Sequence, residues 1–322
     1  MSTSNTTNRI TVVGAGYMGG GMAVSFALGG HHVSLADATP ELAAAGRDRL
    51  LNEAVSFVER GLYPADAADI LAERISSAKA VANAVSESTY IAEVVSERID
   101  IKSGVLVSVA NAAPDDAIIA TNTSAIPIRE LEVHVRKPER FLGVHWMNPA
   151  QFVPGVEIIA GTYTKDEVVS RATELISGIG KVPVKVPDTP GFIANRLQYA
   201  LHKESSRLVE EGLISADELD AVVSNSFGFR LAFFGPMAIA DMAGLDVYAD
   251  TYRSLHGELG EAFAPPKYLQ ELVSEGKLGV KHGGGLTRLS KANSEAVASY
   301  RNAAYSSLSR LKAEVGSAPS EA

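Results

Sequence analysis

The chain contains no cysteine, which excludes disulfide bonds and metal sites built from thiolates, and no metal site is predicted. Positive charge is also scarce. The 29 lysines and arginines are outnumbered by 38 aspartates and glutamates, so the formal net charge is -9. No segment is rich in lysine or arginine. Nucleic acids and anionic membranes both favour dense positive charge, so we expect neither as a main partner.

Long hydrophobic runs are missing as well. No stretch reaches the ~18 uninterrupted apolar residues that a membrane-spanning helix needs. The first eight residues are polar and lack the basic and then apolar pattern of a secretory signal. The composition, with 46% hydrophobic and 21% charged residues over 322 positions, is typical of a globular protein with a buried core. We expect a cytoplasmic protein.

Short β-branched runs alternate with helical segments through the first part of the chain. A helix ends near residue 28, and a helical region of roughly forty residues begins at Pro40 and is interrupted by Gly61. Strands are predicted at residues 9–13, 32–36, 90–96, 117–121, 141–145 and 156–160. This alternation is typical of an α/β fold with a doubly wound parallel sheet of the Rossmann type.

The pattern changes where Pro183, Pro187 and Pro190 cluster, because segments with helical periodicity dominate after them. We therefore predict that an all-α C-terminal domain follows the Rossmann domain. The predicted parts are a disordered tail at residues 1–8, the Rossmann domain at 9–187, the helical domain at 188–315 and a second disordered tail at 316–322.

A glycine-rich segment between the first predicted strand and helix matches the dinucleotide-binding pattern G-x-G-x-x-G. Its residues are Gly14, Ala15, Gly16, Tyr17, Met18 and Gly19. Such glycines permit a tight turn and let the backbone approach a pyrophosphate, which rests on the helix N-terminus. Asp37 ends the second predicted strand, where a carboxylate binds a ribose 2′-OH and repels a 2′-phosphate. The pattern predicts NAD rather than NADP, with a flavin as the rival occupant.

One histidine stands out as a candidate base. A dehydrogenase that oxidises an alcohol needs a base for the hydroxyl proton, and histidine is the usual choice. His145 follows the apolar run FLGV at the carboxyl end of a predicted strand, where ligands bind in open α/β sheets. The other six are expected at the surface: His31, His32, His134, His202, His256 and His282.

Several separate segments resemble the 3-hydroxyacyl-CoA dehydrogenase family over roughly residues 9–285. The matching segments, in the family's order and spacing, are GAGYMG, EVVSERIDIK, TNTSAIPI, GVHWMNP, VEII, DTPGFIANRL, GPMAIADMAGLD and LGVKHGGG. The resemblance implies an NAD-dependent oxidoreductase acting on a CH–OH group. It also implies that the helical domain binds a small-molecule substrate and forms a homodimer.

The resemblance further implies a role for each matched side chain. His145 would be the general base, and Glu157, twelve residues later, would be the carboxylate that orients it. Ser124 and Asn195 would hydrogen-bond the reacting oxygen of the substrate. In addition to the glycine loop and Asp37, the cofactor would be lined by Glu97, Lys102, Asn148 and Lys281.

The chain departs from the family pattern in three places. Trp146 and Met147 replace the aromatic pair common after the catalytic histidine, and two further segments bear on the substrate. Residues 40–78 form a predicted hairpin without lysine, whereas lysines there would suit a nucleotide phosphate. The segment FGFRLAFFGP is longer than usual and is similar to the branch that contains L-gulonate dehydrogenase (lambda-crystallin) and a pyridine-carboxylate dehydrogenase. Arg230 in this segment could pair with a substrate carboxylate through two hydrogen bonds.

Four hypotheses follow. The leading one is oxidation of a hydroxyl group β to a carboxyl or thioester carbonyl, with a 3-hydroxyacyl-CoA as the family's usual substrate. The alternative substrate is a small free acid. A non-catalytic, crystallin-like NAD-binding protein would be expected to lose members of the catalytic set, yet all four are present. The 6-phosphogluconate/3-hydroxyisobutyrate dehydrogenase group needs a lysine and an asparagine on one helix. The helix after Asn195 offers only Lys203, with no asparagine one turn later, so this group is not favoured.

Overall fold

The computed structural model of this chain describes residues 7–282, 284–289 and 291–316 and divides into two compact units, residues 1–203 and 204–322. Most of both predicted tails lies outside the described residues. None of the helices in the described ranges has the length and apolar character needed to span a membrane. The two units meet within one helix, and the predicted domain boundary between residues 187 and 188 stays a prediction.

The first unit is built on one eight-stranded sheet with the order β3-β2-β1-β4-β5-β6-β7-β8. Its strands are β1 (Arg9–Val13), β2 (His32–Ala36), β3 (Ile75–Ser77), β4 (Tyr90–Glu93), β5 (Ile118–Thr121), β6 (Phe141–Trp146), β7 (Gly155–Ala160) and β8 (Val182–Val186). Neighbouring strands are parallel except for β6 and β7, which are antiparallel. The mostly parallel sheet confirms the predicted α/β class.

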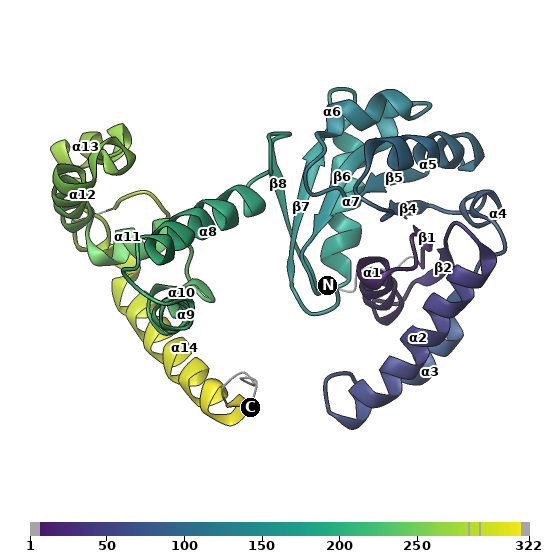
Figure 1. Cartoon of the computed structure of the whole chain (residues 1–322), viewed down its shortest axis with the longest axis horizontal. Coiled ribbons are helices and arrows are strands. Elements are labelled where there is room, and N and C mark those ends of the chain that lie inside the picture. The colour runs from purple at the N-terminus through teal and green to yellow at the C-terminus, as the bar shows by residue number, and fades with distance from the viewer. Residues whose placement is uncertain (1–6, 283, 290, 317–322) are drawn as a thin grey trace. The chain divides into compact units, whose positions relative to one another are not determined.

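Helices cover both faces of this sheet, as in a doubly wound fold (Figure 1). On one face, a core of apolar side chains joins the sheet to α1 (Tyr17–Leu28), α2 (Pro40–Glu59), α3 (Ala67–Arg74) and α7 (Asp166–Gly178). On the other face, a second core joins it to α4 (Val81–Val85), α5 (Ile99–Ala112) and α6 (Ile128–Leu131). Two short 3₁₀ helices, η1 (Glu132–His134) and η2 (Pro138–Arg140), precede β6.

The sheet differs from the sequence-based prediction in three strands. The predicted helical region after Pro40 is the hairpin of α2 and α3, which run side by side (Figure 1), and it is followed by the short strand β3. β4 ends at Glu93 because the side chain of Glu93 accepts a hydrogen bond from the Val95 amide and turns the chain. β8 has valines at alternate positions, but it is short and contains Pro183, one of the prolines that mark the change toward a helical domain.

The described part of the second unit is helical, as predicted. It contains the end of α8 (Ala194–Glu210), then α9 (Ala216–Asn225), α10 (Phe227–Leu231), α11 (Pro236–Ala243), α12 (Leu245–Leu259), α13 (Lys267–Ser274) and α14 (Ser294–Val315), with the 3₁₀ helices η3 (Gly260–Phe263), η4 (Val280–His282) and η5 (Lys291–Asn293). Buried Asp241 accepts hydrogen bonds from the Leu286 and Thr287 amides and thereby ties the segment after η4 to α11.

Candidate functional site

The turn from β1 into α1 has the shape of a dinucleotide cradle. Gly14 has a φ of 118°, and a Cβ there would lie 2.6 Å from the Val94 carbonyl oxygen, so only glycine fits. A Cβ on Gly19 would collide with the carbonyl oxygen of Gly14, whereas one on Gly16 would meet nothing within 4 Å. The space beside Gly16 is therefore open to a ligand.

The N-terminus of α1 is also suited to bind an anion. Gly16 is the N-cap residue and supplies no capping side chain, and the first turn carries no acidic residue. The amides of that turn are consequently available to a phosphate. Tyr17 is 58% exposed at this end of the helix, and Met18 is partly buried against the core. A dinucleotide pyrophosphate fits this arrangement.

Asp37 lies beside the same loop at the end of β2. One carboxylate oxygen accepts a hydrogen bond from the Ala15 amide at 2.6 Å, and the other accepts one from the Ala38 amide at 2.7 Å. The carboxylate thus stands at the edge of the cradle, where the sequence pattern places the group that distinguishes a ribose hydroxyl from a 2′-phosphate.

His145 and Glu157 form a cross-strand pair. The antiparallel register of β6 and β7 places the two residues directly opposite each other, which puts both side chains on one face of the sheet. His145 Nδ1 lies 2.9 Å from Glu157 Oε2. The residues are only 3% and 6% exposed, so water does not weaken this interaction.

The second oxygen of Glu157 is held by the start of α8. Oε1 accepts hydrogen bonds from the Ile193 amide at 3.0 Å and the Ala194 amide at 2.9 Å. The aromatic ring of Phe192 lies 5.5 Å from the His145 ring, measured between centroids. Since both carboxylate oxygens are engaged and the imidazole is packed against a ring, the orientation of His145 is fixed.

Ser124 and Asn195 complete the predicted catalytic set. Ser124 Oγ lies 3.2 Å from His145 Nε2, the ring nitrogen that does not contact Glu157. Asn195 lies in the first turn of α8, and its side-chain nitrogen donates to the Ser124 carbonyl oxygen at 3.2 Å. Asn122 links the ends of β5 and β6, because its side-chain oxygen accepts a hydrogen bond from the Trp146 amide at 2.8 Å. The structure therefore brings all four predicted residues together.

Glu97 holds the loop that carries Ser124. Its Oε1 accepts hydrogen bonds from the Thr123 hydroxyl at 2.6 Å, the Ser124 amide at 2.7 Å and the Ala125 amide at 2.9 Å. Burial by itself would raise the pKa of Glu97, but these hydrogen bonds and the positive charge of Lys102 together lower the pKa below its ordinary value. Glu97 therefore favours its ionised form in the folded chain.

Lys102 lies beneath Glu97 and has no exposed surface. Its ammonium group contacts Glu97 Oε2 at 3.4 Å and donates to Glu93 Oε1 at 2.9 Å, while Glu93 Oε2 accepts a hydrogen bond from the Thr121 hydroxyl at 2.6 Å. The buried ammonium is thus compensated by two carboxylates. Since Lys102 is fully buried, it acts on the site through Glu93 and Glu97.

In the described part of the structure, the remaining predicted site residues form no hydrogen bond with the catalytic set. Asn148 is exposed in the loop between β6 and β7. Lys181 holds that loop, because its ammonium group donates to the carbonyl oxygens of Ala150 at 2.6 Å and Val153 at 2.9 Å. Arg230 is exposed on α10 of the second unit, and the side chain of Lys281 lies outside the described part of the structure.

Sequence reasoning missed several residues that hold this site. Glu93 lies in the segment that the resemblance covers, nine residues before Lys102, but only burial identifies the two as an ion pair. No sequence pattern indicated a role for Phe192 or Lys181, because their contacts join segments that are far apart in the chain. One surface expectation was wrong: His31 is buried, accepts a hydrogen bond from the Asn8 amide, and has its pKa lowered first by burial and then by Arg74.

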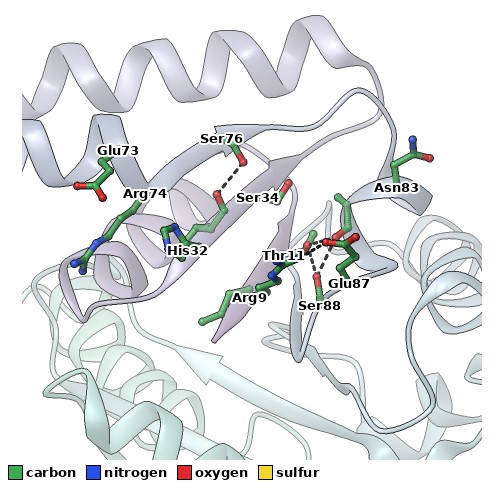
Figure 2. A pocket seen from close by; sticks show the side chains of 13 residues that line it. Arg9, Thr11, His32, Ser34, Glu73, Arg74, Ser76, Asn83, Glu87 and Ser88 are labelled. Carbon is green, nitrogen blue, oxygen red and sulfur yellow. Dashed lines mark hydrogen bonds and ion pairs between the residues drawn. The ribbon is translucent and has the colours of Figure 1, made fainter. Parts of the chain in front are cut away.

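A separate hollow lies near the amino ends of β1 and β2 (Figure 2). His145 lies at the opposite edge of the sheet, near the carboxyl end of β6. The polar groups of the hollow largely bind one another. The hydroxyls of Thr11 and Ser88 are 2.7 Å apart, and Arg9 forms an ion pair with Glu87. None of the predicted site residues lines it, so the candidate site is the carboxyl edge of the sheet and not this hollow.

Replacing Glu97 by glutamine should weaken the acid sensitivity of the fold. The pKa of Glu97 lies below its ordinary value of 4.5 in the folded chain, so the unfolded chain binds the proton more readily. The ionised carboxylate therefore stabilises the fold above pH 4.5, and this stabilisation is lost as the pH falls through the lower, folded-state pKa.

Urea unfolding between about pH 6 and pH 3 measures this loss. The wild-type chain should lose more free energy of unfolding across the range than Glu97→Gln does. Glu59→Gln, at the exposed end of α2, makes the same change of charge and should behave like the wild type. If the free energy of unfolding depends equally on pH in the wild type and in Glu97→Gln, the lowered pKa of Glu97 is contradicted.

Comparison with known proteins gives matches over nearly the whole chain. The family model for the NAD binding domain of 3-hydroxyacyl-CoA dehydrogenase matches residues 9–189, and the model for its C-terminal domain matches residues 191–288. A 5-formyl-3-hydroxy-2-methylpyridine 4-carboxylate 5-dehydrogenase from Mesorhizobium japonicum is 37% identical over 278 residues, covering 86% of this chain and 89% of the relative.

Two further relatives agree with this assignment. A probable 3-hydroxybutyryl-CoA dehydrogenase from Bacillus subtilis is 32% identical and covers 86% of this chain and 96% of its own length. The crystal structure of a 3-hydroxyacyl-CoA dehydrogenase from Archaeoglobus fulgidus superposes with a TM-score of 0.78 at 30% identity, covering 96% of this chain and 99% of that one. The chain therefore belongs to the 3-hydroxyacyl-CoA dehydrogenase family and is an NAD-dependent oxidoreductase that acts on a CH–OH group.

Proposed function

We propose that His145 is the general base of this dehydrogenase and that Glu157 orients it. The observation that carries the proposal is the row of three side chains from Glu157 through His145 to Ser124, with contacts of 2.9 Å and 3.2 Å. A buried carboxylate requires a proton on the nitrogen that it contacts, so His145 Nδ1 carries the hydrogen and Nε2 presents its lone pair. NAD, when bound in the cradle, supplies the acceptor for the hydride.

In this mechanism, His145 Nε2 takes the proton from the substrate hydroxyl. The imidazolium formed is stabilised by Glu157, whose position is held by two backbone amides and does not have to change. The Ser124 hydroxyl and the second amide hydrogen of Asn195 bind the reacting oxygen. Glu97 positions Ser124, and Lys102 stabilises the ionised form of Glu97. Asn148 and Lys281 are proposed to contact the cofactor.

Replacing His145 by glutamine should lower kcat by about 10³-fold, because no side chain then accepts the proton of the substrate hydroxyl. The affinity for NADH, measured by fluorescence titration, should stay within a factor of about two, since His145 is not part of the glycine loop. His32→Gln is the matched control, because His32 is exposed at the amino end of β2. A kcat near the wild-type value in His145→Gln would remove His145 from the mechanism.

For the substrate, we propose a small free acid with a hydroxyl group β to its carboxyl group. Two arginines of the α2–α3 hairpin support this, because their guanidinium groups already donate to backbone carbonyl oxygens. Arg47 donates to Ile75 and Ala72, and Arg74 donates to Ala27. The relative from Mesorhizobium japonicum also bears the name of a carboxylate dehydrogenase. A 3-hydroxyacyl-CoA is the second candidate, favoured by the relative from Bacillus subtilis.

Arg230 is proposed to bind the substrate carboxylate. It is exposed, and its guanidinium group makes no hydrogen bond or ion pair with any other described residue. An unpaired guanidinium can bind a carboxylate through two parallel hydrogen bonds.

Arg230→Ala should therefore raise the KM for free hydroxy acids by roughly tenfold or more and leave acyl-CoA kinetics unchanged. The assay compares L-gulonate, 3-hydroxybutyrate and pyridine carboxylates with 3-hydroxybutyryl-CoA. Arg310→Ala, an exposed arginine of α14, serves as the control. An unchanged KM for every free acid would exclude the proposed contact. Turnover of the acyl-CoA alone would favour the second candidate.

We further propose that the chain forms a homodimer through its helical unit. Among the described residues of that unit, the buried apolar cluster consists of four residues, whereas many large apolar side chains are exposed, among them Leu213, Val222, Met237, Val247 and Tyr268. Exposed apolar surface of this extent is typical of an interface between copies. The cytoplasmic location stays a prediction of the sequence.

Sedimentation equilibrium of the purified chain should give twice the mass of one chain at micromolar concentration. The dimer should persist at high salt, because apolar contacts are not screened. A monomer throughout the concentration range would contradict the proposal.

A further inference from the structure

The helix α2 packs directly on the glycine loop. A Cβ on Gly46 would lie 2.6 Å from the Cβ of Ala15 and 2.9 Å from its carbonyl oxygen. Only a glycine therefore permits this close approach between helix and loop. The next turn of α2 carries Arg49, whose side chain is thereby brought over the loop.

Arg49 binds the loop through its backbone. Nη2 donates to the carbonyl oxygens of Ala15 and Gly16, each at 3.1 Å. The same nitrogen lies 3.0 Å from where a Cβ on Gly20 would stand, so the guanidinium group covers the first turn of α1. Two carbonyl groups of the dinucleotide-binding turn are consequently held by one cation.

The guanidinium group of Arg49 still has hydrogen-bonding capacity to spare. Nε is buried and lacks a hydrogen-bond partner among the described residues, and it lies 3.6 Å from Glu53 Oε1, one turn further along α2. The side chain is 40% exposed, so part of the cation faces the solvent beside the loop. A buried N–H without a partner carries a desolvation cost that a bound anion nearby would reduce.

Asp37 binds the same loop. It accepts the hydrogen bond of the Ala15 amide, while Arg49 binds the Ala15 carbonyl oxygen. Ala15 is therefore fixed at both its amide and its carbonyl group by side chains of opposite charge. The amides that follow at the N-terminus of α1 have no capping side chain, and the space beside Gly16 is open, so an anion can bind there.

We propose that Arg49 is a positioning residue for the pyrophosphate of NAD. It holds the carbonyl oxygens of the glycine loop away from the phosphates and adds a positive charge next to the N-terminus of α1. The proposal rests on the NAD site of the family and is independent of the substrate and of the roles of His145 and Glu157.

The test measures the binding of NADH and of ADP-ribose, which contains the pyrophosphate but no nicotinamide. Arg49→Met should weaken both by the same factor, about tenfold, because a charge-assisted contribution to the phosphate site is lost. The slope of log Kd for NADH against log salt concentration should also become smaller, since one cation no longer acts on the phosphates. kcat at saturating NAD should stay within a factor of about two.

Two further variants separate this role from a structural one. Arg60→Met removes one positive charge at the C-terminal end of α2 and should leave NADH affinity and its salt slope unchanged. Arg49→Lys keeps the charge and should recover most of the salt slope and part of the affinity.

The proposal is overturned if Arg49→Met binds NADH and ADP-ribose as tightly as the wild type does. It is also overturned if Arg60→Met loses as much affinity for NADH as Arg49→Met does. If Arg49→Met does not fold, Arg49→Lys tests the proposal. A wild-type salt slope together with a reduced affinity for NADH supports the positioning role of Arg49, whereas complete loss of NADH binding contradicts it. NADH binding needs no substrate turnover, so failure of this proposal and failure of the His145 mechanism are observed separately.

Discussion

The antiparallel pairing of β6 with β7 is the interaction on which the site depends. Parallel neighbours in this sheet are separated by a helix, whereas β6 and β7 are joined by a short loop, so His145 and Glu157 can face each other twelve residues apart. A buried carboxylate is costly without partners. Glu157 has three, and two of them are amides at the start of α8. The fold thereby links the base to the helix that follows the sheet.

The cofactor side of the site depends on close backbone packing instead of a buried pair. Gly14 and Gly19 permit the tight turn, and Gly16 leaves space for a ligand. The loop that carries Ser124 lies between these two parts and is held by Glu97, which is in turn paired with Lys102. Each reactive group is thus positioned by a partner that is itself buried or bound to the backbone, which favours one fixed geometry.

Much of this arrangement could be predicted from the sequence, because local patterns determine it. The glycine turn, Asp37 and the position of His145 after an apolar strand follow from strand and helix signals along the chain. The resemblance supplied Glu157, Ser124 and Asn195, and the structure brings these residues to His145. The direction of β7 was not predicted, since an apolar run does not show whether a strand is parallel or antiparallel.

The parts that could not be predicted depend on burial and on contacts between distant segments. Lys102 has the sequence signal of a surface lysine, yet it is enclosed with Glu93 and Glu97. Arg49 reaches the glycine loop only because α2 packs on it through Gly46, more than thirty positions along the chain. The strand β3 has one apolar residue in three, and β8, although its valines alternate, is short and contains a proline, so neither gives a clear strand signal.

The central claim is that Glu157 fixes the proton on His145 Nδ1 and leaves Nε2 free to act as a base. Nitrogen-15 NMR of the histidine side chains in the free enzyme tests this most directly, with Glu157→Gln used to assign the signal. The account predicts a neutral His145 with its hydrogen on Nδ1, and a change in that tautomer in the variant. A hydrogen on Nε2 in the wild-type enzyme, or the same spectrum in Glu157→Gln, would contradict it.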